Sequence, residues 1–198
     1  MKLVLATKNS GKVIEFRRIL AELDVTDLEV LGLDSFPDIG DVEETGTTFE
    51  ENSLLKARTI CNLTGLPALA DDSGICVDAL GGAPGIYSAR YSGNGDQANN
   101  QKLLAELKDV PDELRTGYFI CVAAYVTPTG IEQVAEGRFY GKILHEPIGT
   151  GGFGYDPLFK PDGLDRSAAE LSPQEKDQIS HRGKALRAIA PFIARDIR

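Results

Sequence analysis

Hydrophobic positions in the first part of the chain change their spacing twice, which predicts a strand, a helix and a second strand. Residues 2–7 form an apolar run typical of a buried strand, and Asn9-Ser10-Gly11 ends it as a turn. Apolar residues then recur at helical spacing, at Val13, Ile14, Phe16, Ile19, Leu20 and Leu23. Residues 28–33 are a second short strand candidate. A strand that leads through a glycine-containing turn into a helix is typical of an α/β unit.

Capping residues and helical spacing predict further helices along the chain. They are expected from Thr47-Thr48 to about Asn62, over residues 96–108, from Ser172 onward, and around Leu186, Ile189 and Ile193. The strongest start signal is Ser172-Pro173-Gln174-Glu175, because it places Ser at the N-cap, Pro in the first turn and Glu at the third position.

Strand signals predict a hairpin and two shorter strands. Residues 118–126 and 131–143 are expected to pair through a turn at Pro128-Thr129-Gly130. Residues 67–70 and 75–77 are expected to be short buried strands on either side of a turn at Asp71-Asp72-Ser73-Gly74. Together with the opening strand and helix, these elements predict an α/β fold with a mixed sheet.

Composition narrows the class of protein. The chain has 198 residues, of which 42% are apolar and 26% charged, which is typical of one globular domain spanning residues 1–198. The longest uncharged run, residues 116–131, is too short to cross a membrane, and the first residues lack the apolar length of a signal peptide. Cys61, Cys76 and Cys121 are scattered and odd in number, so free thiols are expected. These features predict a cytoplasmic protein with no membrane partner.

The net charge argues against a nucleic acid as partner but does not exclude a nucleotide. The net charge of −9 repels a nucleic-acid backbone over long range, so duplex binding is not expected. A small anion differs, because a few local cations, backbone amides and a divalent metal can hold it inside an acidic protein.

The segment Thr7-Lys8-Asn9-Ser10-Gly11-Lys12 has the residues that a phosphate group needs. It lies between a predicted strand and a helix N-terminus, where free backbone N–H groups, hydroxyl groups and Lys12 can converge. It is not a Walker A motif, because Ala6 and Val13 stand where that motif requires Gly and Ser or Thr. The alternative is an ordinary solvated turn with surface lysines.

Acidic residues in two segments could bind a metal or activate water. Asp71 and Asp72 are successive residues, so on an extended segment their side chains point to opposite sides and only one is expected to enter any one site. That carboxylate could ligate Mg²⁺ or act as a general base. The alternatives are a turn stabilised by Asp and Ser, and, for Glu43-Glu44-Thr45-Gly46, acidic residues that favour the next helix dipole.

Two further segments could recognise a flat ligand. Residues 149–154 match the spacing G-x-G-x-x-G, but the prolines on both sides exclude a dinucleotide-binding helix. A glycine loop that brings Phe153 or Tyr155 against a ring fits better, with a plain hairpin-exit loop as the alternative. In Ser180-His181-Arg182-Gly183-Lys184, Arg182 could donate a forked hydrogen bond to a base, although such a cluster is often only surface.

Collinear motifs over nearly the whole chain resemble the dITP/XTP pyrophosphatase family of non-canonical purine nucleoside triphosphate pyrophosphatases. The matching motifs are Thr7-x-Asn9-x-x-Lys12, residues 43–46, Asn52 with Lys56, residues 70–74, residues 81–91, residues 149–157, residues 169–171 and residues 180–183. The resemblance implies Mg²⁺-dependent hydrolysis of ITP, dITP and XTP to the monophosphate and pyrophosphate, which removes them from the nucleotide pool. It also implies an elongated mixed β-sheet flanked by helices, in two lobes with the active-site cleft between them, and a homodimer.

The resemblance also assigns roles to individual residues. Asp72 would be the general base and, with Glu44, a metal ligand. Phosphate contacts are implied for Thr7, Lys8, Asn9, Ser10, Gly11, Lys12, Lys56 and Lys176. The nucleoside would be surrounded by Ser73, Phe153, Gly154, Tyr155, Asp156, His181 and Arg182.

Physical chemistry is consistent with these roles and leaves two alternatives open. A donor such as Arg182 suits the 6-oxo group of hypoxanthine or xanthine, whereas the 6-amino group of adenine would set donor against donor. The presence of both Asp72 and Lys12 favours catalysis over a nucleotide-binding module without turnover. A pyrophosphatase for other modified or canonical nucleotides is the other alternative.

Overall fold

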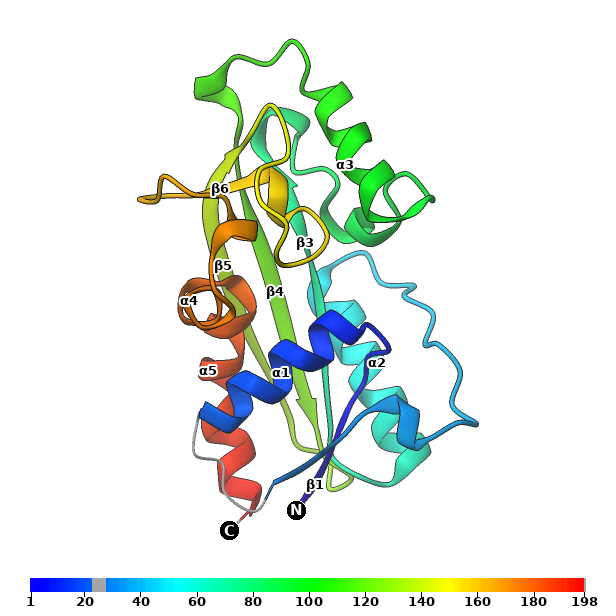
Figure 1. Ribbon diagram of the computed structural model, residues 1–198. Helices are drawn as coiled ribbons and strands as arrows, with labels where there is room; N and C mark the ends of the chain where they lie inside the picture. The colour runs from blue at the N-terminus through cyan, green and yellow to red at the C-terminus, as the bar shows by residue number, and fades with distance from the viewer. Residues whose placement is uncertain (23–27, 198) are drawn as a thin grey trace. The chain divides into compact units, whose positions relative to one another are not determined.

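The computed structural model describes residues 1–22 and 28–197 and contains helices and strands in mixed order (Figure 1). The helices are α1 (Ser10–Glu22), α2 (Phe49–Thr64), α3 (Gly95–Glu106), α4 (Pro173–Ile179) and α5 (His181–Ile197). The strands are β1 (Lys2–Leu5), β2 (Glu29–Leu31), β3 (Ala68–Val77), β4 (Thr116–Val126), β5 (Glu132–Ile143) and β6 (Phe159–Pro161). Leu23, the last apolar position assigned to the first predicted helix, lies outside the described residues.

The strands form one six-stranded sheet in the order β2-β1-β3-β4-β5-β6. Strand β1 is parallel to both β2 and β3, with Val4 opposite Ala68 in the second pair. Strands β5 and β6 are antiparallel, with Ile143 opposite Phe159. The predicted α/β fold with a mixed, helix-flanked sheet is therefore confirmed.

The chain divides into two compact units. The first contains Met1–Asp72, Cys121–Gly137 and Arg182–Arg198, and the second contains Ser73–Ile120 and Arg138–His181. Strands β3, β4 and β5 each contribute residues to both units. A single domain over residues 1–198 stays a prediction.

In the first unit, alternation along the strands sorts side chains onto two covered faces. Leu3, Leu5 and Leu69 pack with α1 and α5, whereas Val4, Ala68 and Ala70 pack with α2. Because successive strand residues point to opposite faces, Asp71 follows Leu69 toward α1 and α5, and Asp72 follows Ala70 toward α2. This alternation decides which residues each aspartate meets.

The second unit has its own core on β3, β4, β5 and α3. Leu103 of α3 and Leu107, just after the helix, are fully buried in it and Leu104 packs against it, as the predicted amphipathic helix requires. Phe119 of β4 stacks on the His181 ring at a centroid distance of 4.9 Å and an interplanar angle of 12°. The start of α5 is thereby fixed by aromatic packing.

The prediction of two short strands around a turn at residues 71–74 is wrong, because β3 runs unbroken from Ala68 to Val77. Asp and Gly favour turns, but here Asp71 and Asp72 are both buried in the interior of the strand. Burying carboxylates is tolerated where cations and hydrogen-bond donors meet them. Those partners come from distant parts of the chain and are not visible in the local sequence.

The predicted hairpin and cysteine states are observed. Strands β4 and β5 are neighbours joined by a turn in which Gly130 N donates to Thr127 O at 3.0 Å. Cys61, Cys76 and Cys121 are free and buried.

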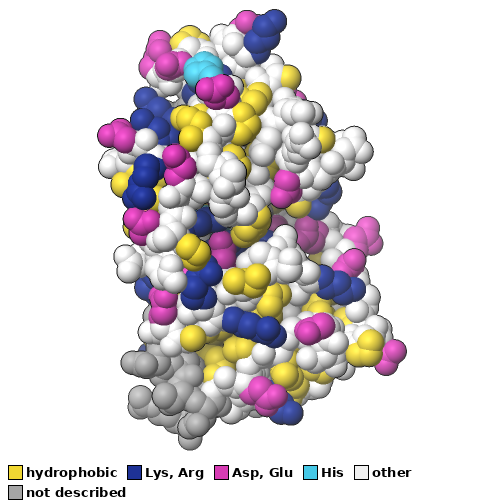
Figure 2. All heavy atoms as spheres, viewed as in Figure 1, with side chains coloured by type: hydrophobic (Ala, Val, Ile, Leu, Met, Phe, Trp, Pro, Cys, Tyr) yellow, Lys and Arg dark blue, Asp and Glu magenta, His cyan; other side chains and the backbone are white. Residues whose placement is uncertain are grey.

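Among residues 1–22 and 28–197, none of the helices combines the length and apolar character that crossing a bilayer requires. On the face shown in Figure 2, acidic and basic side chains are interspersed with apolar ones.

The predicted capping box at the start of α4 is confirmed. The Ser172 hydroxyl accepts from Glu175 N at 3.2 Å, and the Glu175 carboxylate accepts from Ser172 N at 2.8 Å. Arg166 also donates to Glu175, at 2.9 Å. The Arg166 side chain and these capping hydrogen bonds lower the pKa of Glu175 to about 2.

Replacing the capping carboxylate by an amide should reveal this pKa shift as a pH-dependent stability difference. Because the folded pKa lies below the ordinary glutamate value of about 4.3, the stabilisation is present above that value and is lost as the pH falls toward 2. Glu175→Gln should therefore have a lower urea midpoint than the wild type at pH 7, and the two midpoints should converge toward pH 3. A constant difference across this range would contradict the assignment.

Candidate active site

The turn between β1 and α1 is organised by its own side chains. Thr7 Oγ1 accepts from Asn9 N at 3.2 Å, and Asn9 Oδ1 accepts from Lys12 N at 3.0 Å. Asn9 thus caps α1, which begins at Ser10. Lys8 is exposed and forms an ion pair with Asp41 at 3.2 Å. The predicted phosphate loop is therefore an ordered turn at a helix N-terminus, where Gly11 lies in the first turn.

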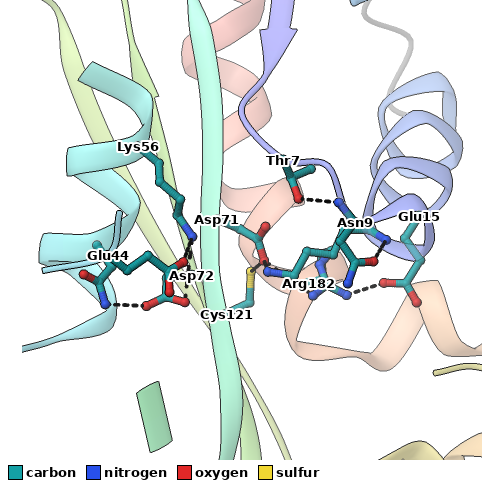
Figure 3. Close-up of polar contacts among 11 residues, drawn as sticks. Thr7, Asn9, Glu15, Glu44, Lys56, Asp71, Asp72, Cys121 and Arg182 are labelled. Atoms are coloured by element: carbon teal, nitrogen blue, oxygen red, sulfur yellow. Dashed lines mark hydrogen bonds and ion pairs between the residues drawn. The ribbon is translucent and has the colours of Figure 1, made fainter. Parts of the chain in front are cut away.

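Asp71 lies at the centre of a buried ion-pair cluster on the α1 and α5 side of β3 (Figure 3). Its Oδ2 is 3.0 Å from Lys12 Nζ and 3.4 Å from Arg182 Nη2. Arg182 also bonds the Glu15 carboxylate, so two cations and two anions meet there. Although burial alone would raise it, Lys12 and Arg182 hold the pKa of Asp71 well below its ordinary value.

Asp72 faces α2, where a different set of side chains surrounds it (Figure 3). Asn52 Nδ2 donates to Asp72 Oδ2 at 3.0 Å, and Lys56 Nζ lies 3.9 Å from Asp72 Oδ1. Lys56 Nζ also contacts Glu44 Oε1 at 2.5 Å. Burial raises the pKa of Asp72, and the negative charge of Glu44 adds to this, while Lys56 opposes it.

Lys56 stays charged in this buried position. Burial favours its neutral form, but the charges of Asp71, Asp72 and Glu44 outweigh this and raise the pKa of the ammonium group. Lys56 therefore brings positive charge to the two carboxylates of Asp72 and Glu44.

These two carboxylates could hold a divalent cation. Both contact the same ammonium nitrogen, so they lie close together, and carboxylate oxygens are the ligands that Mg²⁺ prefers. Within residues 1–22 and 28–197, no cluster of three or more acidic, His or Cys side chains could hold a metal. A pair of carboxylates fits a cation that takes its remaining ligands from water and substrate phosphates.

In the second unit, the glycine-rich loop is built around Asp156. The Asp156 carboxylate accepts from Phe153 N at 2.9 Å and from Lys176 Nζ at 2.6 Å, and Asp156 and Lys176 are both buried. Lys176 Nζ also lies 4.9 Å from the centre of the Phe153 ring. At Gly152, where φ is +69°, an added Cβ would lie 2.1 Å from the Asp156 carboxylate, so this turn requires glycine.

Residues of α3 and of the 81–91 motif fix the loop from behind. The Tyr155 hydroxyl donates to Ser88 O at 2.8 Å, and its ring is buried in the core of the second unit. Asn100 Nδ2 donates to Gly154 O at 3.0 Å, and Gly154 N donates to Asp96 Oδ2 at 2.9 Å. Phe153, which is only partly buried, is therefore more available for stacking than Tyr155.

The structure sorts the predicted residues into two groups. In the first unit lie Thr7, Lys8, Asn9, Ser10, Gly11, Lys12, Glu44, Lys56, Asp72 and Arg182. In the second unit lie Ser73, Phe153, Gly154, Tyr155, Asp156, Lys176 and His181. Lys176 contacts the glycine-rich loop, and Arg182 contacts Glu15 and Asp71. The phosphate contact expected for Lys176 and the base contact expected for Arg182 stay predictions.

The sequence reasoning missed two residues that contact the predicted site, Glu15 and Asn100, and it gave no role to Asn52, which it had quoted with Lys56 as a motif. The contact of Asn52 with Asp72 could have been expected, because Asn52 precedes Lys56 by four residues and so shares its helix face. Glu15 and Asn100 gave no such signal, since their partners lie far away in the sequence.

Comparison with known proteins gives consistent matches. A model of the Ham1 family matches residues 3–192. A dITP/XTP pyrophosphatase of Streptomyces avermitilis is 54% identical over 194 residues, covering 97% of this chain and 96% of the relative. A dITP/XTP pyrophosphatase of Geobacter sulfurreducens is 54% identical over 187 residues, covering 93% and 92%.

Solved structures match over nearly the whole chain as well. The Ham1 protein of Staphylococcus aureus has a TM-score of 0.86 and 39% identity, covering 99% of this chain and 100% of that one. The HAM1 protein of Coxiella burnetii has a TM-score of 0.87 and 41% identity, covering 98% and 99%.

Removing the charge of Asp71 should strongly destabilise the protein. Asp71→Asn leaves the buried Arg182 and the half-buried Lys12 with one anion fewer, and breaking a buried ion pair in this way costs about 3–5 kcal/mol. Urea unfolding at pH 7 measures this loss. Asp41→Asn is the matched control, because it breaks an ion pair that is largely exposed and should barely change the midpoint. Similar midpoints for the two variants would contradict the structural role of Asp71.

Proposed function

The chain belongs to the Ham1 family, and on this basis we propose that it hydrolyses non-canonical purine nucleoside triphosphates to the monophosphate and pyrophosphate. The proposed substrates are ITP, dITP and XTP. The names of the curated relatives support this reaction, since relatives about half identical over nearly the whole chain are dITP/XTP pyrophosphatases.

The observation that carries the proposal is the different surroundings of Asp71 and Asp72. Asp71 is neutralised by Lys12 and Arg182, so its Oδ2 is engaged in holding the fold. Asp72 has a raised pKa and lies near a second carboxylate and a lysine. A carboxylate that is more basic than usual is suited to take a proton from water.

We assign the phosphates of the substrate to the first unit. The Thr7–Lys12 turn supplies backbone N–H groups at a helix N-terminus, and Lys12 and Lys56 supply positive charge. Attack at the α-phosphorus requires neutralisation of the triphosphate and of the leaving pyrophosphate. In this assignment Asp72 orders the attacking water and accepts its proton.

We propose that Glu44 and Asp72 hold Mg²⁺ together with substrate oxygens. When bound, such a cation supplies charge neutralisation and orientation of the phosphates. Asp72 would then serve both as a ligand and as the group that receives the proton, while Lys56 keeps the two carboxylates close before substrate arrives.

We assign the base to the glycine-rich loop of the second unit. Phe153 would stack on the ring, with Ser73, Gly154, Tyr155, Asp156 and His181 lining the nucleoside region. Lys176 contacts both Phe153 and Asp156, so we assign its ammonium group to the 6-oxo acceptor of the base rather than to phosphate. Arg182, whose guanidinium already bonds Glu15, would act on the base as an additional donor.

The family resemblance further supports a homodimer and a cytoplasmic location, which we include in the proposal.

Two competing functions have different experimental outcomes. A pyrophosphatase for other nucleotides would turn over a different substrate set, and a nucleotide-binding module would bind without turnover.

The activity is tested by pyrophosphate release from ITP, dITP, XTP, ATP and GTP, each with and without Mg²⁺. We expect turnover of the first three that depends on Mg²⁺, with kcat/KM for ATP lower by at least about 10²-fold because donors would face donors at the 6-position of adenine. Guanine shares the 6-oxo group, so a lower kcat/KM for GTP requires discrimination around the 2-position of the base. A kcat/KM for ATP or GTP equal to that for ITP, dITP and XTP would refute the proposed specificity. Absence of turnover for all five would refute the enzyme.

Replacement of the proposed base tests the mechanism. Asp72→Asn should lower kcat for ITP by about 10²–10⁴-fold, because the amide can neither accept the proton nor supply a charged ligand. Asp78→Asn, an exposed aspartate just after β3 that bonds Thr116, is the control and should retain wild-type kcat. Near-normal activity of Asp72→Asn, with an unchanged unfolding midpoint, would exclude Asp72 as the base.

A further inference from the structure

Asn52 makes contacts that the roles assigned above do not use. It lies in the first turn of α2, and its side chain is completely buried (0% exposed). Its backbone N–H donates to Thr48 O at 3.1 Å, so the main chain is already helical at this position. A buried amide in a helix requires hydrogen-bond partners for both ends of its side chain.

Both partners of the amide belong to the predicted metal-binding region. Asn52 Oδ1 accepts from Gly46 N at 2.8 Å, and Asn52 Nδ2 donates to Asp72 Oδ2 at 3.0 Å. A backbone N–H can only donate, so the amide oxygen must face Gly46 and the NH₂ group must face Asp72. The group presented to Asp72 is therefore a donor, which favours the ionised carboxylate.

The segment that carries Glu44 is packed directly on this amide. An added Cβ at Gly46 would lie 2.7 Å from Asn52 Oδ1 and 2.7 Å from Glu51 Cβ. Glycine at position 46 thus lets the 44–46 segment approach α2 closely. Because Glu44 is only two residues away, its position depends on the same contact.

We propose that Asn52 is a positioning residue that fixes Asp72 and the Glu44 segment relative to each other, so that both carboxylates are held ready for one cation. This inference rests on the proposed function, and it assigns to Asn52 no contact with substrate. Asn52 holds one oxygen of Asp72, while the other lies 3.9 Å from Lys56 Nζ. The carboxylate is therefore held from two sides by side chains of the same helix.

Two variants of Asn52 separate its two hydrogen bonds. Asn52→Leu has a similar volume and removes both, whereas Asn52→Asp keeps an acceptor for Gly46 and replaces the donor to Asp72 by a carboxyl group. Each is expected to lower kcat for ITP by about 10–100-fold, the range found when a residue that orients a metal ligand is lost, with KM changed less than kcat. Ser53→Ala is the matched control, because Ser53 is the neighbouring buried residue and its hydroxyl donates to Glu50 O rather than to the predicted metal-binding region. It should stay within about 2-fold of wild type.

The decisive comparison repeats Asn52→Leu in the Asp72→Asn background. If Asn52 acts through Asp72, the further loss of kcat there should be under about 3-fold, because the group being positioned is already altered. Urea midpoints of the same four proteins, measured without nucleotide or metal, should likewise be non-additive. This second readout keeps the test independent of the proposed function, which fails separately if the wild type releases no pyrophosphate.

The same fractional loss of kcat in both backgrounds, together with additive urea midpoints, would overturn the proposal and leave Asn52 with a purely structural role. Wild-type kcat in Asn52→Leu would also overturn it, since that variant lacks both hydrogen bonds of the amide.

Discussion

The ion pairs of Asp71 with Lys12 and Arg182 are the interaction on which the first unit depends. They allow a central strand to continue through two successive carboxylates where the local sequence favours a turn. Lys12 ends the predicted phosphate loop and Arg182 lies in the first turn of α5, so one buried carboxylate connects two helices through β3. Glu15 completes the charge balance by bonding Arg182.

The alternation of side chains along β3 places the neighbouring residues Asp71 and Asp72 in different surroundings. Because Asp71 and Asp72 point to opposite faces, the cations that neutralise the first leave the second near Glu44, Lys56 and Asn52. One carboxylate stabilises the fold, and the other, whose pKa is raised, is the one to which we assign water activation. A buried carboxylate stabilises the second unit as well, where Asp156 accepts hydrogen bonds from Lys176 and from the backbone of the glycine-rich loop.

Local signals predicted much of the fold, and long-range partners explain what they missed. The capping box of α4 and the inward leucines of α3 depend on near neighbours, so they were predictable from spacing. The continuity of β3 was not, because it depends on cations from distant helices. For the site, the opposite orientation of Asp71 and Asp72 followed from strand geometry, whereas the partners of Arg182 required the tertiary structure.

The most direct test of this division is the pH titration of the aspartate carboxyl carbons by ¹³C NMR, with Asp71 and Asp72 assigned from their Asn variants. The carboxyl carbon of Asp71 should titrate well below the ordinary aspartate pKa of about 3.9, and that of Asp72 above it. Equal values, or the reverse order, would contradict the assignment of a structural role to one aspartate and a chemical role to its neighbour.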